Sequence, residues 1–290
     1  MGELRLFGSV NSAGKILQTP YGDKVAQILH EDTLRGLDVV FFAAGGDVST
    51  EWCPKAAQMG ITCIDKSSVF RMNPDIPLVV PEVNPGDLGE NKIIANPNCT
   101  TSIAAVVLAP LHREFGLKKV IMSTYQAASG AGQPAMEELK SSTRAALAGE
   151  DFEPKEFAHN LAFNVIPKID SFTPNQYTKE EMKVTDELRK ILHLPDSVLI
   201  ECTAVRIPIL RAHSESITIE TEKPFDAQRA RDILSRSPGV EVVDNPSEQT
   251  YPMPNTVEGQ DDVQVGRIRQ SLVFGDHGGT FFVSGDQLLK

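Results

Sequence analysis

One unbroken apolar run, DVVFFAA at residues 38–44, restricts the fold of this chain more than any other feature. It has the length of a strand, does not alternate with polar residues and ends at Gly45-Gly46, which is typical of a strand buried on both faces of a parallel sheet. Further strands are predicted at 4–10, 61–65 and 92–95, and a helix at 49–60, which Ser49 caps and Gly60 ends. The first third of the chain therefore predicts an open parallel sheet with helices on its faces.

The rest of the chain has a different pattern. Strands with partial alternation are predicted at 118–125, 198–205, 216–220 and 263–268, and helices at 100–115, 133–148, 178–192 and 226–235. This combination favours a mixed sheet in an α+β domain. We therefore expect two domains, with residues 1–98 in the first and 99–290 in the second.

Composition disfavours several classes of protein. The 290 residues carry a formal net charge of −11, a poor match for binding to nucleic acid or to an anionic membrane. Four cysteines in this length form no disulfide framework, and none of their spacings is typical of zinc ligands. No apolar run approaches the roughly 18 residues of a membrane span. We expect a cytoplasmic protein with free thiols and no metal, which binds small molecules.

Cys99 is the strongest candidate for chemistry. It follows Asn96-Pro97-Asn98 and starts a predicted helix, where unsatisfied backbone N–H groups lower a thiol pKa and stabilise an oxyanion. A thiolate there is a nucleophile for carbonyl carbon. The alternative is a structural cysteine in the core, which is the reading we give to Cys53, Cys63 and Cys202.

Two further residues are candidates for acid–base chemistry and anion binding. His213 has polar neighbours between two predicted strands, so a neutral imidazole near Cys99 would serve as acid and base; a solvated loop histidine is the alternative. Arg206 lies in the same segment and, like Arg71 further upstream, has a guanidinium that matches a carboxylate or a phosphate. Surface arginines are the alternative for both.

Other residues carry weaker signals. Glu180 and Lys183 are three apart on one predicted helix, a spacing typical of a solvated ion pair. The loop Ser129-Gly130-Ala131-Gly132 would let backbone approach a ligand, and Gln126 stands just before it at the end of a strand.

Several motifs in order along the chain resemble one family, the aspartate-semialdehyde dehydrogenases. The matching stretches are SSVFRMNP (67–74), VVPEVN (79–84), NPNCTT (96–101), STYQAASGAG (123–132), VRIP (205–208), HSES (213–216) and VGRIR (265–269). The family reduces a β-aspartyl phosphate to aspartate semialdehyde with NADPH, on the route to lysine, threonine and methionine.

The resemblance implies a role for each matching residue. Cys99 would be the nucleophile that forms an acyl-thioester, His213 the acid/base, and Gln126 the group that orients the substrate carbonyl. The remaining matches bind ligands: Arg206 the substrate α-carboxylate, Glu180 the substrate amine, Arg71, Asn98 and Lys183 the phosphate, and Ser129 and Gly130 the nicotinamide end of the cofactor.

The resemblance also implies an architecture and a set of partners. We expect a Rossmann-like parallel-sheet cofactor domain followed by an α+β mixed-sheet domain for substrate binding and homodimer formation. The family's opening strand with its Gly-rich turn, and its C-terminal helix, have no counterpart here, so we expect the cofactor domain to be N-terminally incomplete. Asn11 and Ser12 fall where the family has Arg-Ser to bind the 2′-phosphate of NADP; because Asn carries no charge, NAD is the alternative cofactor.

Two other readings remain open. One is a related acyl-phosphate or acyl-CoA reductase, such as N-acetyl-γ-glutamyl-phosphate reductase or malonyl-CoA reductase; the former has Cys-Tyr-Pro where this chain has Cys99-Thr100-Thr101. The other is a non-catalytic paralogue that only dimerises. Turnover of an acyl-CoA would favour the first, and equal alkylation of all four thiols would favour the second.

Overall fold

A computed structural model describes residues 2–290, which fall into two compact units. The first unit holds the residues up to 79 together with 86–96, and the second holds 80–85 together with 97–290. Within residues 2–290, no helix has both the length and the apolar character needed to cross a membrane.

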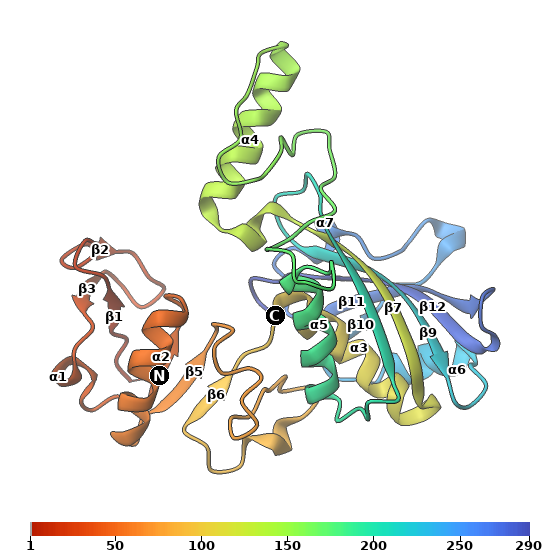
Figure 1. Cartoon of the computed structure of the whole chain (residues 1–290), viewed down its shortest axis with the longest axis horizontal. Coiled ribbons are helices and arrows are strands. Elements are labelled where there is room, and N and C mark those ends of the chain that lie inside the picture. Colours follow the sequence, from red (N-terminus) through yellow and green to blue (C-terminus); the bar gives the residue numbers. More distant parts are fainter. Residues whose placement is uncertain (1) are drawn as a thin grey trace. The chain divides into compact units, whose positions relative to one another are not determined.

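The first unit contains two small sheets (Figure 1). Its elements are β1 (Leu6–Gly8), β2 (Ile16–Leu17), β3 (Lys24–Ile28), α1 (Glu31–Leu34), β4 (Val39–Phe42), α2 (Gly46–Gln58), β5 (Thr62–Asp65) and β6 (Ile93–Ala95). β4, β5 and β6 are parallel, as predicted, and β1 pairs with β3 in parallel while β2 adds an antiparallel edge. Strands β2 and β3 were not predicted from the sequence.

The structure corrects the expectation that residues 38–44 are buried on both faces. Val40 and Phe42 are buried, whereas Phe41 is 68% exposed. The core forms on one side of β4 only, where Leu34 of α1 and Cys53 of α2 pack beside Val40 and Phe42. Alternate residues of a strand point to opposite faces, so Phe41 lies on the other side.

The start of α2 also differs from the prediction. The helix begins at Gly46 with Gly45 as its N-cap, so Ser49 lies inside the first turn rather than capping it. Its hydroxyl donates to the Gly45 carbonyl (3.2 Å) and to the Asp65 carboxylate (2.6 Å), and both side chains are buried. A serine that bonds to a neighbouring strand is indistinguishable from a cap in the sequence alone.

The second unit is built on one six-stranded mixed sheet, in the order β10-β11-β12-β9-β7-β8. Its helices and strands are α3 (Cys99–Phe115), β7 (Leu117–Gln126), α4 (Gln133–Ala148), α5 (Lys179–Ile191), β8 (Leu199–Arg206), β9 (His213–Thr221), α6 (Ala227–Leu234), β10 (Val240–Val242), α7 (Pro254–Val257), β11 (Val263–Ser271) and β12 (Gly275–Gly285). It also has 3-10 turns at Ala128–Ala131 and Pro246–Glu248, while a third, Pro85–Leu88, lies at the boundary between the units. Only β7–β8 and β10–β11 are parallel pairs, so the mixed sheet is confirmed.

One face of this sheet packs on helices α3, α5 and α6 (Figure 1). On β9 the residues His213, Glu215, Ile217 and Ile219 are all fully buried on the same face. Gly285 of β12 pairs with His213, and a Cβ on it would meet Ile103 of α3, so this is the face that α3 covers. The site residues of this unit therefore come from strand ends and helices that share one core.

Candidate active site

Cys99 is the first residue of α3, as predicted to within one residue. Asn98 caps the helix through its side-chain Oδ1, which accepts the N–H groups of Thr100 (3.0 Å) and Thr101 (3.4 Å) and the Thr100 hydroxyl (2.5 Å). Both threonines are fully buried, whereas Cys99 is only partly buried. Cys99 is thus less buried than the two residues that follow it at the helix start.

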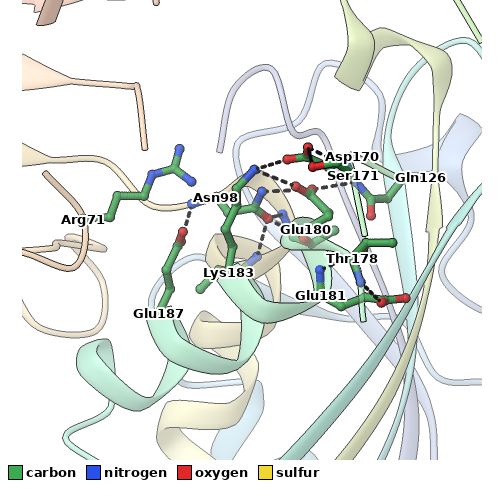
Figure 2. Close-up of polar contacts among 12 residues, drawn as sticks. Arg71, Asn98, Gln126, Asp170, Ser171, Thr178, Glu180, Glu181, Lys183 and Glu187 are labelled. Carbon is green, nitrogen blue, oxygen red and sulfur yellow. Dashed lines mark hydrogen bonds and ion pairs between the residues drawn. The ribbon is translucent and has the colours of Figure 1, made fainter. Parts of the chain in front are cut away.

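The helix α5 holds Asn98 from outside α3. Glu180 Oε1 accepts the side-chain amide of Asn98 at 2.9 Å, and Glu187 Oε2 accepts its main-chain N–H at 2.6 Å (Figure 2). The same Glu180 oxygen accepts the amide of Gln126 at 3.2 Å, while Gln126 Oε1 accepts the Thr124 hydroxyl at 2.9 Å. Asn98, Gln126 and Glu180, named separately from the sequence, form one buried network.

Lys183 joins this network through two ion pairs. Its Nζ lies 2.8 Å from Asp170 and 3.4 Å from Glu180. Burial lowers the pKa of Lys183, but the ion pairs with Asp170 and Glu180 outweigh burial and leave that pKa raised. The expectation of a solvated Glu180–Lys183 pair is wrong, because the Glu180 side chain is only 8% exposed and helix α5 turns it towards the sheet.

His213 is the first residue of β9 and is fully buried, so the prediction of a loop histidine with polar surroundings is wrong. Its Nδ1 accepts the Ala127 N–H at 3.1 Å, which places the proton of the neutral ring on Nε2. Burial, and then the charge of Arg206, lower the pKa of His213 to about 3. Nε2 has no hydrogen-bond partner in the part of the chain that the structure describes, so it is a neutral donor ready for a ligand.

Arg206 ends β8 beside Gln126, which ends the neighbouring parallel strand. The guanidinium is 6% exposed, donates to the Ala127 carbonyl at 2.5 Å and lies 6.0 Å from the Phe157 ring. Burial lowers the pKa of Arg206, whereas a thiolate at Cys99 and the Glu180 carboxylate raise it. Arg206 also lines a cavity of about 330 Å³ together with Phe157, Lys168 and two acidic residues, Glu156 and Asp170, so the cavity carries charges of both signs.

The backbone of Gly130 lies close to the side chains of Arg206 and His213. A Cβ at this position would lie 2.9 Å from Arg206 Nη1 and 3.0 Å from His213 Nε2, closer than side chains tolerate. The preceding residue, Ser129, is held by Gln287, whose amide donates to its hydroxyl at 2.5 Å. The loop therefore needs glycine for close approach of its backbone to the histidine and the arginine.

Glu215 is a buried acid on the sheet face that α3 covers, and it takes part in none of the contacts described above. Glu215, two residues after His213 on the same face of β9, is fully buried, and neither of its oxygens has a partner within residues 2–290. Burial raises the pKa of Glu215 well above its ordinary value. No pattern in the sequence marked Glu215 as a candidate site residue.

The three remaining predicted residues lie in the first unit. Asn11 and Ser12 form a turn after β1, where Asn11 is exposed and Ser12 donates its N–H to Ser9 (2.8 Å). Arg71 is 8% exposed and donates to the Lys66 carbonyl at 3.0 Å. The structure describes these residues within their own unit, so the grouping of Arg71 with Asn98 and Lys183 at a phosphate site, and the role of Asn11 and Ser12 at the cofactor, stay predictions.

A cavity of about 570 Å³ in the first unit fits a nucleotide cofactor by its position. It is lined by Gly8, Ser9 and Val10 after β1, by Ala43 and Ala44 after β4, and by Trp52 of α2. Open α/β sheets bind nucleotides beyond the carboxyl ends of their parallel strands, where Ser9, Val10, Ala43 and Ala44 lie. The cavity also extends along the strands, since apolar residues of β1 and β4 such as Phe7, Val40 and Phe41 line it. Among residues 2–290, no three His, Cys, Asp or Glu side chains are grouped to hold a metal ion.

Two residues of the network were not predicted. Glu187 lies seven residues after Glu180, so the repeated acid on one helical face was a usable signal. Asp170 lies in a loop next to Ser171 and meets Lys183 only through the tertiary fold. No sequence signal marks Asp170.

Comparison with known proteins gives consistent matches. Residues 1–91 match the family described as "Semialdehyde dehydrogenase, NAD binding domain", and residues 108–290 match "Semialdehyde dehydrogenase, dimerisation domain". The chain is 46% identical to an aspartate-semialdehyde dehydrogenase of Aquifex aeolicus, with 99% of this chain and 86% of the relative covered. For the enzyme of the same description from Bacillus subtilis the identity is 44%, with 100% and 86% covered. A crystal structure of aspartate semialdehyde dehydrogenase II from Vibrio cholerae, complexed with ASA, has a TM-score of 0.94 at 37% identity and covers 99% of this chain and 85% of that one.

Proposed function

The chain belongs to the aspartate-semialdehyde dehydrogenases, and we propose that it converts L-4-aspartyl phosphate to L-aspartate 4-semialdehyde, reversibly and with NADP, through a thioester on Cys99. This step serves the synthesis of lysine, threonine and methionine. The observation that carries the proposal is the convergence of three groups in one unit. A partly buried thiol begins α3, near enough to Arg206 that its thiolate form would raise the pKa of Arg206, and Gly130 lies against both Arg206 and a neutral, unpartnered His213 Nε2.

The first half of the reaction needs only groups of the chain. The Cys99 thiolate attacks the acyl carbon, an S–C bond forms, and the C–O bond to phosphate breaks. The charges of Lys183 and Arg71 offset that of the departing phosphate, and the amide of Asn98 donates to it. Arg206 holds the substrate α-carboxylate with a planar pair of donors, and Glu180 accepts the substrate ammonium.

The second half turns the thioester into an aldehyde. The nicotinamide supplies a hydride to the thioester carbon when it is bound. His213 Nε2–H donates to the oxygen on which negative charge develops, and the amide of Gln126 orients the same carbonyl. Collapse of this tetrahedral species breaks the S–C bond and returns the thiolate of Cys99. Ser129 and Gly130 bring backbone close to the nicotinamide end.

We assign the choice between NADP and NAD to residues of the first unit. The family match and the cavity beyond β1 and β4 support a nicotinamide dinucleotide. Asn11 and Ser12 are the residues we assign to the adenosine ribose, and both donate hydrogen bonds to a 2′-phosphate. Because neither is charged, NAD competes with NADP more strongly than it would with arginine at position 11.

We propose a homodimer that forms through the second unit. The matched family is described as a dimerisation domain, and the six-stranded sheet carries a cavity of about 330 Å³ lined by Tyr251, Met253 and Phe282 among others. We expect the enzyme to act in the cytoplasm, since all four cysteines are free and thiols stay reduced there.

One assay tests the proposal. The purified chain is given aspartate semialdehyde, NADP⁺ and inorganic phosphate, and reduction of the nucleotide is followed by absorbance. We expect reduction that requires phosphate and disappears in Cys99→Ser. Reduction that requires coenzyme A instead of phosphate would assign the chain to the acyl-CoA reductases, and activity retained in Cys99→Ser would refute the thioester.

A further inference from the structure

The helix α5 carries a buried acid that none of the roles above uses. Glu187 lies two helical turns after Glu180 and is 1% exposed. Its Oε2 accepts the main-chain N–H of Asn98 at 2.6 Å, a contact between residues 89 apart in the sequence (Figure 2). This is the shortest of the hydrogen bonds that join α5 to Asn98.

Asn98 is held at each of its polar atoms. Glu187 accepts its main-chain N–H, and Glu180 accepts its side-chain amide. Its Oδ1 accepts from Thr100, and its carbonyl accepts the Ser102 N–H at 2.9 Å. The residue next to the sulfur is therefore fixed both by its own helix and by α5.

The helix α5 is itself fixed to the sheet, so it can serve as a rigid support. Thr178 and Glu181 form a capping box at its start, and Glu181 Oε1 also accepts the Ala204 N–H of β8 at 2.9 Å. Val184 and Leu188 of the same helix are fully buried. A side chain of α5 that binds Asn98 therefore fixes the start of α3 relative to β8.

We propose that Glu187 is a positioning residue for acyl transfer: by holding the main chain of Asn98, it fixes the start of α3 and thereby the sulfur of Cys99. The inference rests on the proposed function, in which Cys99 becomes acylated. The role requires an acceptor that reaches the Asn98 N–H, and it does not require the charge. Glutamine has the same reach with a neutral acceptor, whereas aspartate keeps the charge and is one methylene shorter.

The experiment compares Glu187→Asp with Glu187→Gln. Each protein is mixed with L-4-aspartyl phosphate in the absence of nucleotide, and acylation of Cys99 is followed by mass spectrometry of quenched samples. We expect Glu187→Asp to acylate about 10- to 100-fold more slowly, since a misplacement of about 1 Å costs up to 100-fold. We expect Glu187→Gln to stay within about threefold of the parent rate.

Glu181→Asp is the matched control. Glu181 is equally part of α5, is buried and accepts two backbone N–H groups, but its partners are Thr178 and Ala204 rather than Asn98. We expect it to lower the melting temperature at least as much as Glu187→Asp but to slow acylation clearly less, because the buried Val184 and Leu188 still hold α5 on the sheet and the Glu187 contact with Asn98 is kept. Acylation of Glu187→Asp at the parent rate, equal slowing in Glu187→Gln, or equal slowing in Glu181→Asp would each overturn the inference. Acylation that persists in Cys99→Ser would instead refute the proposed function.

Discussion

The two units of the molecule hold their predicted functional residues in different ways. In the second unit, Asn98, Gln126, Glu180 and Lys183 are joined by hydrogen bonds and ion pairs. In the first unit, Asn11 is exposed in a turn, and the cavity beyond the strands is bordered by exposed apolar surface such as Phe41.

This difference separates two requirements of the reaction. The proposed covalent chemistry needs the sulfur, the acid and the anion clamp within a fraction of an ångström of their working places, and we expect the buried network of the second unit to contribute that order. Recognition of a nucleotide tolerates adjustment on binding. The comparison therefore predicts that changes in the second unit alter acylation, whereas changes in the first alter the choice of nucleotide.

The largest effect is expected for Cys99→Ser. A serine hydroxyl at this helix start is a far weaker nucleophile than a thiolate, so semialdehyde oxidation should fall by about 10⁴-fold or more. Nucleotide binding by the first unit, measured by fluorescence titration with NADP, should not change. A loss of nucleotide binding equal to the loss of turnover would break the separation between the units.

Gly130→Ala should have the next largest effect. Its added Cβ would lie 2.9 Å from Arg206 and 3.0 Å from His213, so the loop or these side chains must move. We expect acylation of Cys99 to slow by about 100-fold, with little change in melting temperature. Acylation at the parent rate in Gly130→Ala would mean that this close approach has no bearing on the chemistry.

Arg206→Lys tests whether a change in the second unit affects substrate binding more than nucleotide binding. Lysine cannot form the paired hydrogen bonds of a guanidinium to a carboxylate, so the KM for aspartate semialdehyde should rise about 10- to 100-fold. The KM for the nucleotide should change much less. Equal increases in both constants, measured by steady-state kinetics, would count against Arg206 as the carboxylate clamp.

Asn11→Arg is the corresponding test of the first unit. A guanidinium next to the adenosine ribose should favour NADP over NAD by about tenfold, the value of one charge-assisted contact with phosphate. Acylation of Cys99 in the absence of nucleotide should be unchanged. An unchanged ratio of the NADP and NAD dissociation constants would remove Asn11 from the cofactor site.

The smallest effect is expected on stability, from Glu215→Gln. The raised pKa of the buried Glu215 means that its stabilising contribution is complete below pH 4.5 and is lost as the pH rises towards the folded-state pKa. In this pH range Glu215 should lower the free energy of unfolding by about 1.4 kcal/mol for each pH unit, and replacement by glutamine should abolish that fall. Urea unfolding at pH 5 and pH 6 would measure it, and identical pH dependence in both proteins would contradict it.

The sequence predicted the second unit better than the first. Helix α4 was predicted at its observed limits and α3 within one residue, because caps, glycines and proline mark those ends. Strand β12 was missed, since four glycines in Gly275–Gly285 hide its alternation. In the first unit, DVVFFAA predicted a strand but not its one-sided burial, which depends on where the helices pack.

The site residues show the same limit: their identity could be predicted from motifs, but their burial could not. Motifs named Cys99, Asn98, Glu180 and His213, although the expected domain boundary put Asn98 with residues 1–98, whereas it lies in the second unit with the other three. Local sequence also predicted the wrong surroundings for His213. Its polar neighbours predict a loop, whereas pairing with Gly285 of β12 buries it completely. Burial produced by partners distant in the sequence is not visible in local composition.

Mass spectrometry of the parent protein, quenched shortly after mixing with L-4-aspartyl phosphate without nucleotide, tests the account most directly. The account predicts a mass increase of one aspartyl group, located on the peptide that contains Cys99 and removed by hydroxylamine. An unmodified Cys99 under conditions in which phosphate is released, or an aspartyl group on another residue, would contradict it.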